Sequence, residues 1–251
     1  MKECEIFSNL KVPCGSKLVL RLDGRSFYML SKECGLEKPY DSLFVDAMVN
    51  TAIYIMREFS PSFIYTFSDE FNILMDHVPF SGRVEKMDSV FASFSATSFL
   101  HNFNKNLLKS EECNSGKSRV LNTVSFDSRV IPLSSEMVMN YFKSRQDESW
   151  RNCLNGYAYW TLRDEMDKNQ AMNQLKGLKS SQIHDLLFER GINISEVPAW
   201  QRRGVGIYKG EIEIKGYNPL HKKDVLTTRK KIITDWDLPI FNQDFFQEME
   251  L

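Results

Sequence analysis

The stretch Lys17-Leu18-Val19-Leu20-Arg21-Leu22-Asp23-Gly24-Arg25-Ser26-Phe27 decides how the rest of the chain is interpreted. It begins as an apolar run of the length that a buried strand needs. It ends at an acid followed by glycine, which lets the backbone approach a ligand closely. A carboxylate at the end of a central strand suits a bound cation, although Asp-Gly is also a common turn pair. The stretch alone therefore leaves a cation site and an ordinary turn open.

A second acidic position follows between two predicted strands. Phe63–Phe67 and Phe71–Met75 are rich in β-branched and aromatic residues, as strands are. Ser68-Asp69-Glu70 interrupts them as a tight turn. In a bare hairpin an acidic turn is unremarkable, because turns favour polar residues. Whether this acidic turn takes part in a functional site depends on where Asp23 lies relative to it.

The remaining elements of the first half give the order of the fold. Helices are predicted over 42–59, behind an N-cap at Asp41, and over 84–108. A further strand is predicted over 123–127. Strand, helix, strand, strand, helix, strand is the ferredoxin-like βαββαβ order of an α+β fold, an antiparallel sheet with helices on one face.

This order brings the two acidic positions together, because the third strand of such a sheet lies beside the first. Asp23 and the pair Asp69-Glu70 are therefore expected at one edge. Clustered carboxylates raise one another's pKa unless positive charge lies between them. Hard divalent cations prefer oxygen ligands, and two acids that bridge two Mg²⁺ ions suit phosphoryl or nucleotidyl transfer. We therefore predict a cation site at this edge.

Composition narrows the class of protein. The chain has 251 residues, of which 42% are hydrophobic and 26% charged, as in ordinary globular proteins. Its net charge of -1 means that nucleic-acid binding needs a local basic face. The five cysteines form no C-x-x-C pair, which favours reduced thiols and a cytoplasmic location. No signal peptide or apolar run of spanning length is apparent, so no membrane partner is expected.

Five separated motifs occur in a recognisable order. They are Arg21-Leu22-Asp23-Gly24-Arg25 with Ser26-Phe27, Lys38-Pro39 with Asp41, Ser68-Asp69-Glu70, Phe126-Asp127-Ser128-Arg129, and Arg145-Gln146. From about Leu18 to Arg203 this series resembles the tRNA-histidine guanylyltransferase superfamily. Those enzymes add nucleotides in the 3′-to-5′ direction at the 5′ end of RNA. The resemblance implies a nucleotidyltransferase whose partners are nucleoside triphosphates and the acceptor stem of tRNA.

The resemblance also implies an architecture. Residues 1–135 are expected to form a palm-like catalytic domain, which agrees with the βαββαβ order. Residues 136–251 are expected to form a helical and hairpin extension packed on the palm as one compact unit. Family members are commonly tetramers, so a homo-oligomer, tetramer or dimer, is expected.

Three sets of site residues follow. By resemblance, the catalytic acids are Asp23, Asp69 and Glu70, and the ligands of two Mg²⁺ ions are Asp23, Gly24 and Asp69. The predicted contacts to nucleotide, with ATP or GTP as the activating substrate, are Arg21, Arg25, Ser26, Phe27, Lys38, Ser68, Asn152 and Asn155. The predicted contacts to RNA are Arg129, Arg145, Arg202, Arg203, Lys222, Lys223 and Arg229.

The second half supports some of these assignments from the residues themselves. A helix is predicted over 136–162, and its period places Asn152 and Asn155 on one face, where amides can bind a ribose, a base or a phosphate; a solvated polar face is the alternative. A hairpin is predicted around Lys209-Gly210. The Lys and Arg clusters beyond it are the candidate footprint for RNA phosphates, although charge runs often only face solvent.

One departure from the family pattern bears on the substrate. Strict guanylyltransferases carry H-I-N-N-L-Y-N where this chain has Trp150-Arg151-Asn152-Cys153-Leu154-Asn155-Gly156. This resembles the like-protein branch, which repairs 5′-truncated tRNAs by copying the opposite strand of the acceptor stem. Template-dependent addition is therefore expected, and the alternative is addition of one untemplated guanylate to tRNA-histidine. A nucleotide cyclase and a non-catalytic RNA-binding module are further alternatives. Such a module stacks bases on aromatic residues of its central strands, and the first predicted strand of this chain has none.

Overall fold

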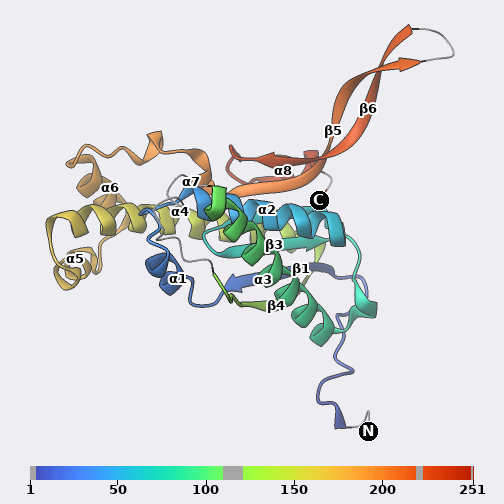
Figure 1. Cartoon of the computed structure of the whole chain (residues 1–251), viewed down its shortest axis with the longest axis horizontal. Helices are drawn as coiled ribbons and strands as arrows, with labels where there is room; N and C mark the ends of the chain where they lie inside the picture. The colour runs from blue at the N-terminus through green and yellow to red at the C-terminus, as the bar shows by residue number, and fades with distance from the viewer. Residues whose placement is uncertain (1–3, 110–120, 219–222, 250) are drawn as a thin grey trace.

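The computed structural model describes residues 4–109, 121–218, 223–249 and 251. Six strands form one antiparallel sheet in the order β4-β1-β3-β2-β5-β6 (Figure 1). The first half of the chain contributes β1 (Lys17–Gly24), α1 (Phe27–Glu33), α2 (Ser42–Phe59), β2 (Phe63–Phe67), β3 (Glu70–Met75), the short helix η2 (Phe80–Gly82), α3 (Val84–Lys109) and β4 (Phe126–Leu133). The α+β fold and the βαββαβ order are therefore confirmed.

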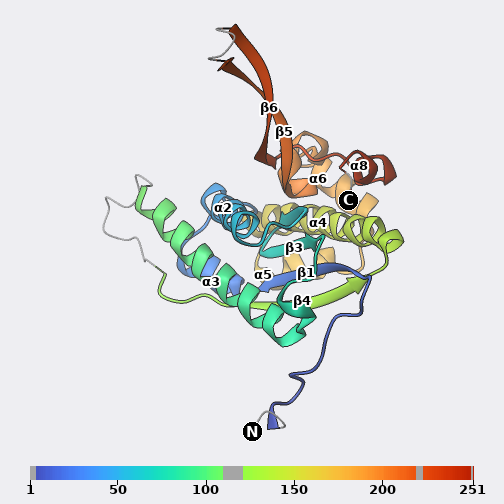
Figure 2. The ribbon, with the colours of Figure 1, turned by 90° about the vertical axis from the view of Figure 1, so that its right-hand side faces the viewer.

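The second half adds helices and a long hairpin. Its elements are α4 (Ser135–Glu165), α5 (Lys168–Leu175), α6 (Ser180–Phe188), η4 (Ile194–Glu196), α7 (Ala199–Arg203), β5 (Val205–Asn218), β6 (Lys223–Asp235) and α8 (Gln243–Glu248). Figure 2 shows the outer part of the β5–β6 hairpin projecting from the body as an arm. Because β5 pairs with β2, both halves share one sheet, and the expected boundary at residue 135 stays a prediction.

The alternation of β1 separates two cores. Leu18, Leu20 and Leu22 are fully buried on the face that α2 and α3 cover. Val19 lies on the opposite face, where Phe142 of α4 and aromatic residues near the C-terminus pack against β2. Successive side chains of a strand point to opposite faces, so Arg21 and Asp23 share the α4 face. The helices of the βαββαβ unit thus cover one face, and the extension covers the other.

Helix α2 begins and ends where the sequence predicts it. The side chain of Asp41 accepts a hydrogen bond from the backbone N–H of Phe44 over 3.1 Å, as an N-cap does. The strand predicted over 123–127 was placed too early, because β4 starts at Phe126 and continues through Pro132. β4 is an edge strand, where proline removes no hydrogen bond that the sheet needs.

The hairpin predicted around Lys209-Gly210 is wrong. β5 is continuous there, and Gly210 is paired with Lys231 of β6. A Cβ atom on Gly210 would lie 2.2 Å from Cδ1 of Ile233, so the glycine makes room for a side chain of the neighbouring strand.

Within the described residues, no helix is long and apolar enough to cross a membrane.

Gly204, between α7 and β5, offers a test of this packing. Its φ is 73° and its ψ -169°, a region that glycine alone adopts readily. A Cβ atom there would lie 2.5 Å from the Tyr65 ring and 2.7 Å from the Thr66 carbonyl oxygen. We predict that Gly204→Ala lowers the free energy of unfolding by about 3 kcal/mol, measured by denaturant titration.

Gly177→Ala is the matched control. Gly177 also has a positive φ, 81°, but nothing lies within 4 Å of a Cβ placed on it. Only the backbone strain remains, about 1 kcal/mol. Equal losses in the two variants would contradict the close approach of Gly204 to Tyr65.

Candidate active site

Three acidic residues lie side by side on neighbouring strands at one end of the sheet. In the registers of β1 with its neighbours, Asp23 lies opposite Asp127 of β4 and opposite Glu70 of β3. The backbone N–H of Gly24 donates to the carbonyl oxygen of Asp69 over 3.0 Å, which ties the end of β1 to the β2–β3 turn. The expected meeting of Asp23 with Asp69 and Glu70 at one edge is therefore confirmed. We call Asp23 and Asp69 together the acidic edge.

The environment of Asp69 suits a cation. Burial and the charge of Asp23 raise the pKa of Asp69, against the effect of a hydrogen bond from Ser68 Oγ to Asp69 Oδ1, 3.0 Å long. Within the described residues no three His, Cys, Asp or Glu side chains form a metal-binding group. Mg²⁺ commonly binds through one or two carboxylates plus substrate phosphates and water, so two carboxylates fit it. The assignment of Asp23, Gly24 and Asp69 as ligands stays a prediction.

Gly24 and Phe27 form the floor of this region. A Cβ atom on Gly24 would lie 2.5 Å from Cδ2 of Phe27. The Phe27 ring is buried, with its centroid 5.1 Å from those of both Phe99 and Phe126. The absence of a side chain at residue 24 therefore lets a core aromatic ring pack directly beneath the acidic edge.

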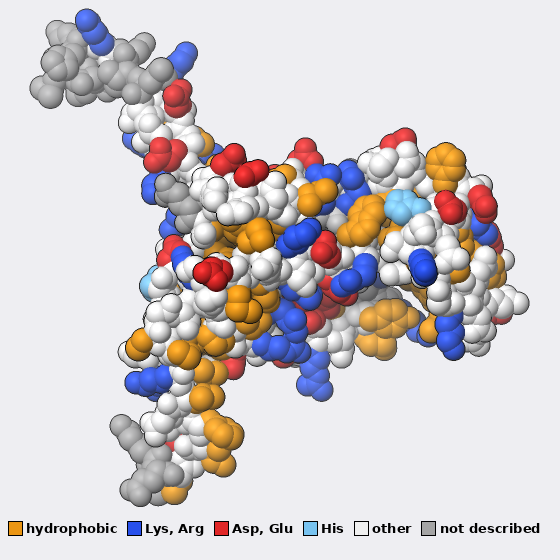
Figure 3. All heavy atoms as spheres, turned by 180° about the vertical axis from the view of Figure 1, so that it is seen from behind, with side chains coloured by type: hydrophobic (Ala, Val, Ile, Leu, Met, Phe, Trp, Pro, Cys, Tyr) orange, Lys and Arg blue, Asp and Glu red, His pale blue; other side chains and the backbone are white. Residues whose placement is uncertain are grey.

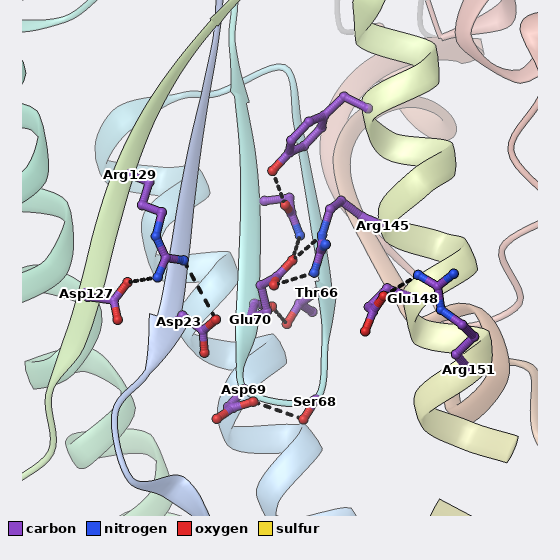
Figure 4. Close-up of polar contacts among 12 residues, drawn as sticks. Asp23, Thr66, Ser68, Asp69, Glu70, Asp127, Arg129, Arg145, Glu148 and Arg151 are labelled. Atoms are coloured by element: carbon purple, nitrogen blue, oxygen red, sulfur yellow. Dashed lines mark hydrogen bonds and ion pairs between the residues drawn. The ribbon is translucent and has the colours of Figure 1, made fainter. Parts of the chain in front are cut away.

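Arg129, predicted to contact RNA, lies between two of the carboxylates (Figure 4), and its RNA contact stays a prediction. Its guanidinium is 3.2 Å from Asp127 Oδ1 and 4.0 Å from Asp23 Oδ2. Cross-strand pairing places Arg21 beside Arg129, and Nε of Arg21 is buried without a hydrogen-bond partner among the described residues. A basic row thus lies behind the acidic one. Asp127 was missed as a site residue, although the Phe126–Arg129 motif contains it.

Glu70, predicted to be a catalytic acid beside the cations, forms an ion pair with Arg145, and its catalytic role stays a prediction. Its Oε1 and Oε2 accept hydrogen bonds from Nε and Nη2 of Arg145 over 2.8 and 2.7 Å. The two side chains are only 7% and 18% exposed. Burial lowers the pKa of Arg145, but the bonds and charge of Glu70 outweigh it and raise that pKa overall. Arg145, expected to contact RNA, is thus committed to a buried ion pair, and breaking such a pair costs about 3–5 kcal/mol.

A pocket of about 340 Å³ opens beside the acidic edge. Asp69 and several aromatic side chains line it. Four of the residues predicted to contact nucleotide also line it: Phe27, Lys38, Ser68 and Asn152. This volume is in the range of small-molecule sites. Desolvation lowers the pKa of Lys38, against the opposing charge of Asp41. Its Nζ donates to Ser31 Oγ and lies 5.7 Å from the centroid of the Trp160 ring.

The other predicted nucleotide contacts lie elsewhere. Arg25 and Ser26 line a second hollow of about 350 Å³, on the side of residues 121–125. Asn155 is exposed and donates to the carbonyl oxygen of Arg151 over 2.9 Å, away from the lining of the main pocket. The structure therefore separates Asn152 from Asn155, although helical spacing gives them one face.

The remaining RNA-contact predictions divide into two groups. Arg202 donates to the carbonyl of Val197 and Arg203 to that of Leu238, each over 3.0 Å, so both brace the backbone. Lys223 and Arg229 are exposed on the β5–β6 hairpin, and Lys222 lies outside the described residues. Figure 3 shows Lys and Arg side chains interspersed with acidic ones over the middle of the back face.

Comparison with known proteins shows that this protein is a nucleotidyltransferase. Residues 1–134 match the family model described as tRNAHis guanylyltransferase, and residues 136–236 match that of its C-terminal domain. The chain belongs to the tRNAHis guanylyltransferase family. It is thus an enzyme of 3′-to-5′ nucleotide addition at the 5′ end of tRNA.

Relatives and structures agree with this membership. A probable tRNA(His) guanylyltransferase of Dictyostelium discoideum is 27% identical over 239 residues, covering 92% of this chain and 88% of the relative. A bacterial tRNA(His) guanylyltransferase-like protein in complex with ATP gives a TM-score of 0.71 at 24% identity, covering 100% of this chain and 96% of that chain. A complex of such a protein with GTP gives 0.62 at 22% identity, covering 96% and 93%. At these identities the structures establish the shared fold.

The raised pKa of Asp69 predicts a pH dependence of stability. Because the folded pKa lies above the unfolded one, the folded state binds more protons between the two values, and stability falls as pH rises through that window. Ionised Asp69 therefore destabilises the cation-free protein at neutral pH. We predict that Asp69→Asn raises Tm at pH 7 in chelator, with a gain that shrinks as the pH approaches about 3.9.

Asp164→Asn, at an exposed position, is the control for the lost charge. Both variants are followed by thermal unfolding across the same pH series. The prediction is contradicted if the rise in Tm for Asp69→Asn equals that of the control or does not change with pH, because ionised Asp69 would then not destabilise the folded state.

Proposed function

We propose that the acidic edge and the adjoining pocket carry out 5′ activation of tRNA and then 3′-to-5′ addition of a nucleotide. In the first step the 5′-monophosphate attacks the α-phosphate of ATP or GTP, and pyrophosphate leaves. In the second, the 3′-hydroxyl of an incoming nucleoside triphosphate attacks the activated 5′-phosphate, and the nucleoside monophosphate leaves. The observation that carries the proposal is Asp69, which belongs both to the acidic edge and to the wall of a nucleoside-sized pocket.

Asp23, Asp69 and the backbone oxygen of Gly24 would hold two Mg²⁺ ions. Bound there, the ions would lower the pKa of the attacking hydroxyl and neutralise charge on the leaving group. The bacterial relatives solved in complex with ATP and with GTP support a nucleoside triphosphate as a ligand of this protein. Glu70, predicted as a catalytic acid, is tied to Arg145 and takes no part in this mechanism.

The chain's own side chains suit a nucleotide in the pocket. Phe27 and its aromatic neighbours offer apolar surface to a base, and Asn152 offers an amide. Lys38 supplies a positive charge for a phosphate, as a point charge on a flexible stem. Arg21 lies outside the pocket lining, on the same face of β1 as Asp23; its Nε is buried without a partner among the described residues and suits a second phosphate contact.

The partner is the 5′ end of a tRNA. On a chain with net charge -1, the exposed Lys223 and Arg229 of the hairpin are candidates for phosphate contacts. We retain a homo-oligomer as a proposal based on the family resemblance, and a cytoplasmic location as one based on the scattered, unpaired cysteines.

Two versions of the substrate remain in contention. The name of the Dictyostelium relative favours addition of a guanylate to tRNA-histidine, and we take this as the main proposal. Template-dependent repair of 5′-truncated tRNA is the second. It is favoured by Trp150, which occupies the place of the motif's histidine and packs against His184 at a tilt, with ring centroids 5.5 Å apart.

A primer-extension assay tests the reaction and separates the two versions. We predict that the protein extends a 5′-monophosphorylated tRNA with Mg²⁺ and nucleotides, and that Asp23→Asn or Asp69→Asn lowers the rate by a factor of about 1,000 or more. Guanylate added opposite any template base supports the first version, whereas additions that follow the template base support the second. Full activity in either variant would overturn the proposal.

The two asparagines of α4 test the position of the pocket. Asn152 lines it and Asn155 does not. We predict that Asn152→Ala weakens ATP or GTP binding roughly tenfold, the size of one lost hydrogen bond to a charged group. Asn155→Ala, of identical chemistry one helical turn away, should leave binding within twofold. The reverse order, measured by isothermal titration calorimetry, would place the nucleotide elsewhere.

A further inference from the structure

Glu70 lies close enough in the sheet to be a third acid at the cation site. It is the register partner of Asp23, and directly paired residues of antiparallel strands point to the same face. The backbone alone would therefore allow its carboxylate to join those of Asp23 and Asp69. Figure 4 shows it turned instead toward α4 and Arg145.

A closed network holds Glu70 in that orientation. Besides the two bonds from Arg145, Oε1 of Glu70 accepts a hydrogen bond from Nδ2 of Asn72 over 2.8 Å. Oδ1 of Asn72 in turn accepts from the hydroxyl of Tyr141 over 2.6 Å. Asn72 is fully buried and Glu70 is 5% exposed. Tyr141 and Arg145 are four residues apart on α4 and so lie on one face of the helix.

The ion pair with Arg145 neutralises the Glu70 carboxylate, which could otherwise bind a cation at the acidic edge. A buried carboxylate is costly unless it is paired and hydrogen-bonded, and here both of its oxygens are satisfied by groups outside the acidic edge. The mechanism proposed above does not require Glu70. Its partner is an arginine whose two donors fit both carboxylate oxygens, the geometry that holds a carboxylate most firmly.

We propose that Arg145, supported by Asn72 and Tyr141, withholds Glu70 from the acidic edge, so that cations meet two carboxylates rather than three. The inference rests on the proposed cation site and adds to it the number of protein ligands. Glu70 and Arg145 are thus positioning residues rather than catalytic residues.

The number of carboxylates matters because the reaction needs open positions on the cation. Mg²⁺ in phosphoryl-transfer sites keeps several waters and binds through one or two carboxylates plus substrate phosphates. A third carboxylate would tighten cation binding, occupy a position that a phosphate oxygen needs, and repel the triphosphate. Withholding it keeps the cation accessible to substrate.

Binding of Mn²⁺ alone, followed by electron paramagnetic resonance of the free ion at pH 8, tests this without any turnover. Arg145→Met removes both donors at similar size. We expect it to bind Mn²⁺ about tenfold more tightly, which corresponds to about 1.4 kcal/mol. Adding Glu70→Gln should abolish that gain, and Glu70→Gln alone should leave the affinity within twofold of the unchanged protein.

Two controls accompany the series. Arg151→Met removes the same charge from an exposed ion pair with Glu148 on the same helix, and should not change Mn²⁺ affinity. Asp23→Asn should weaken it at least tenfold. If Asp23→Asn has no effect, the proposed cation site fails and this inference fails with it. If Asp23→Asn weakens binding and Arg145→Met has no effect, only the withholding of Glu70 is wrong.

A tenfold weakening by Glu70→Gln alone would also overturn the inference, because Glu70 would then already be a ligand. Circular dichroism establishes whether each variant folds. If Arg145→Met does not fold, Tyr141→Phe, which loses only the hydroxyl, takes its place. Its expected result is about threefold tighter Mn²⁺ binding, and unchanged affinity would overturn the proposal.

Discussion

The hydrogen bond from the Gly24 N–H to the Asp69 carbonyl, 3.0 Å long, closes the pairing of β1 with β3 and fixes what the site contains. The side-chain period of a strand is two residues, so a slip of one residue would turn Asp23 toward α2 and α3. The buried leucines of β1 prevent that slip, because they would then leave the core. The hydrophobic pattern of one strand therefore holds a carboxylate in place for chemistry on its other face.

The α4 face then carries charge in two rows. Asp127, Asp23 and Glu70 form the outer row, and Arg129 and Arg21 lie one step behind on β4 and β1. Arg129 and Arg145 each neutralise part of the outer row. What remains for a cation is Asp23, which Arg129 approaches only to 4.0 Å, and a half-buried Asp69 with a raised pKa beside a pocket. The number of acidic residues alone does not identify the cation ligands. The acids that pair closely with an arginine are neutralised within the protein, and the others are available to a cation.

The sequence predicted the elements whose patterns are local. α2 follows from its apolar period and its Asp41 cap, and the Asp23–Asp69 meeting follows from the strand order. It could not predict the partner of Glu70, because the carboxylate and the guanidinium are far apart along the chain and meet only through the packing of α4 on the sheet. The reason is different for Asn155: its helical spacing with Asn152 predicts a shared face, but its amide donates to the carbonyl of Arg151 in its own helix. Gly210 was misread because a glycine that admits the Ile233 side chain and a glycine in a turn look alike in sequence.

The central claim is that Asp23 and Asp69, on neighbouring elements of the sheet, hold divalent cations while Glu70 does not. Anomalous scattering from crystals grown with Mn²⁺ and a non-hydrolysable ATP analogue measures this directly. The account predicts peaks within bonding distance of the carboxylates of both Asp23 and Asp69, with the Glu70–Arg145 ion pair intact. Peaks bonded to Glu70, or absent from either aspartate, would contradict it.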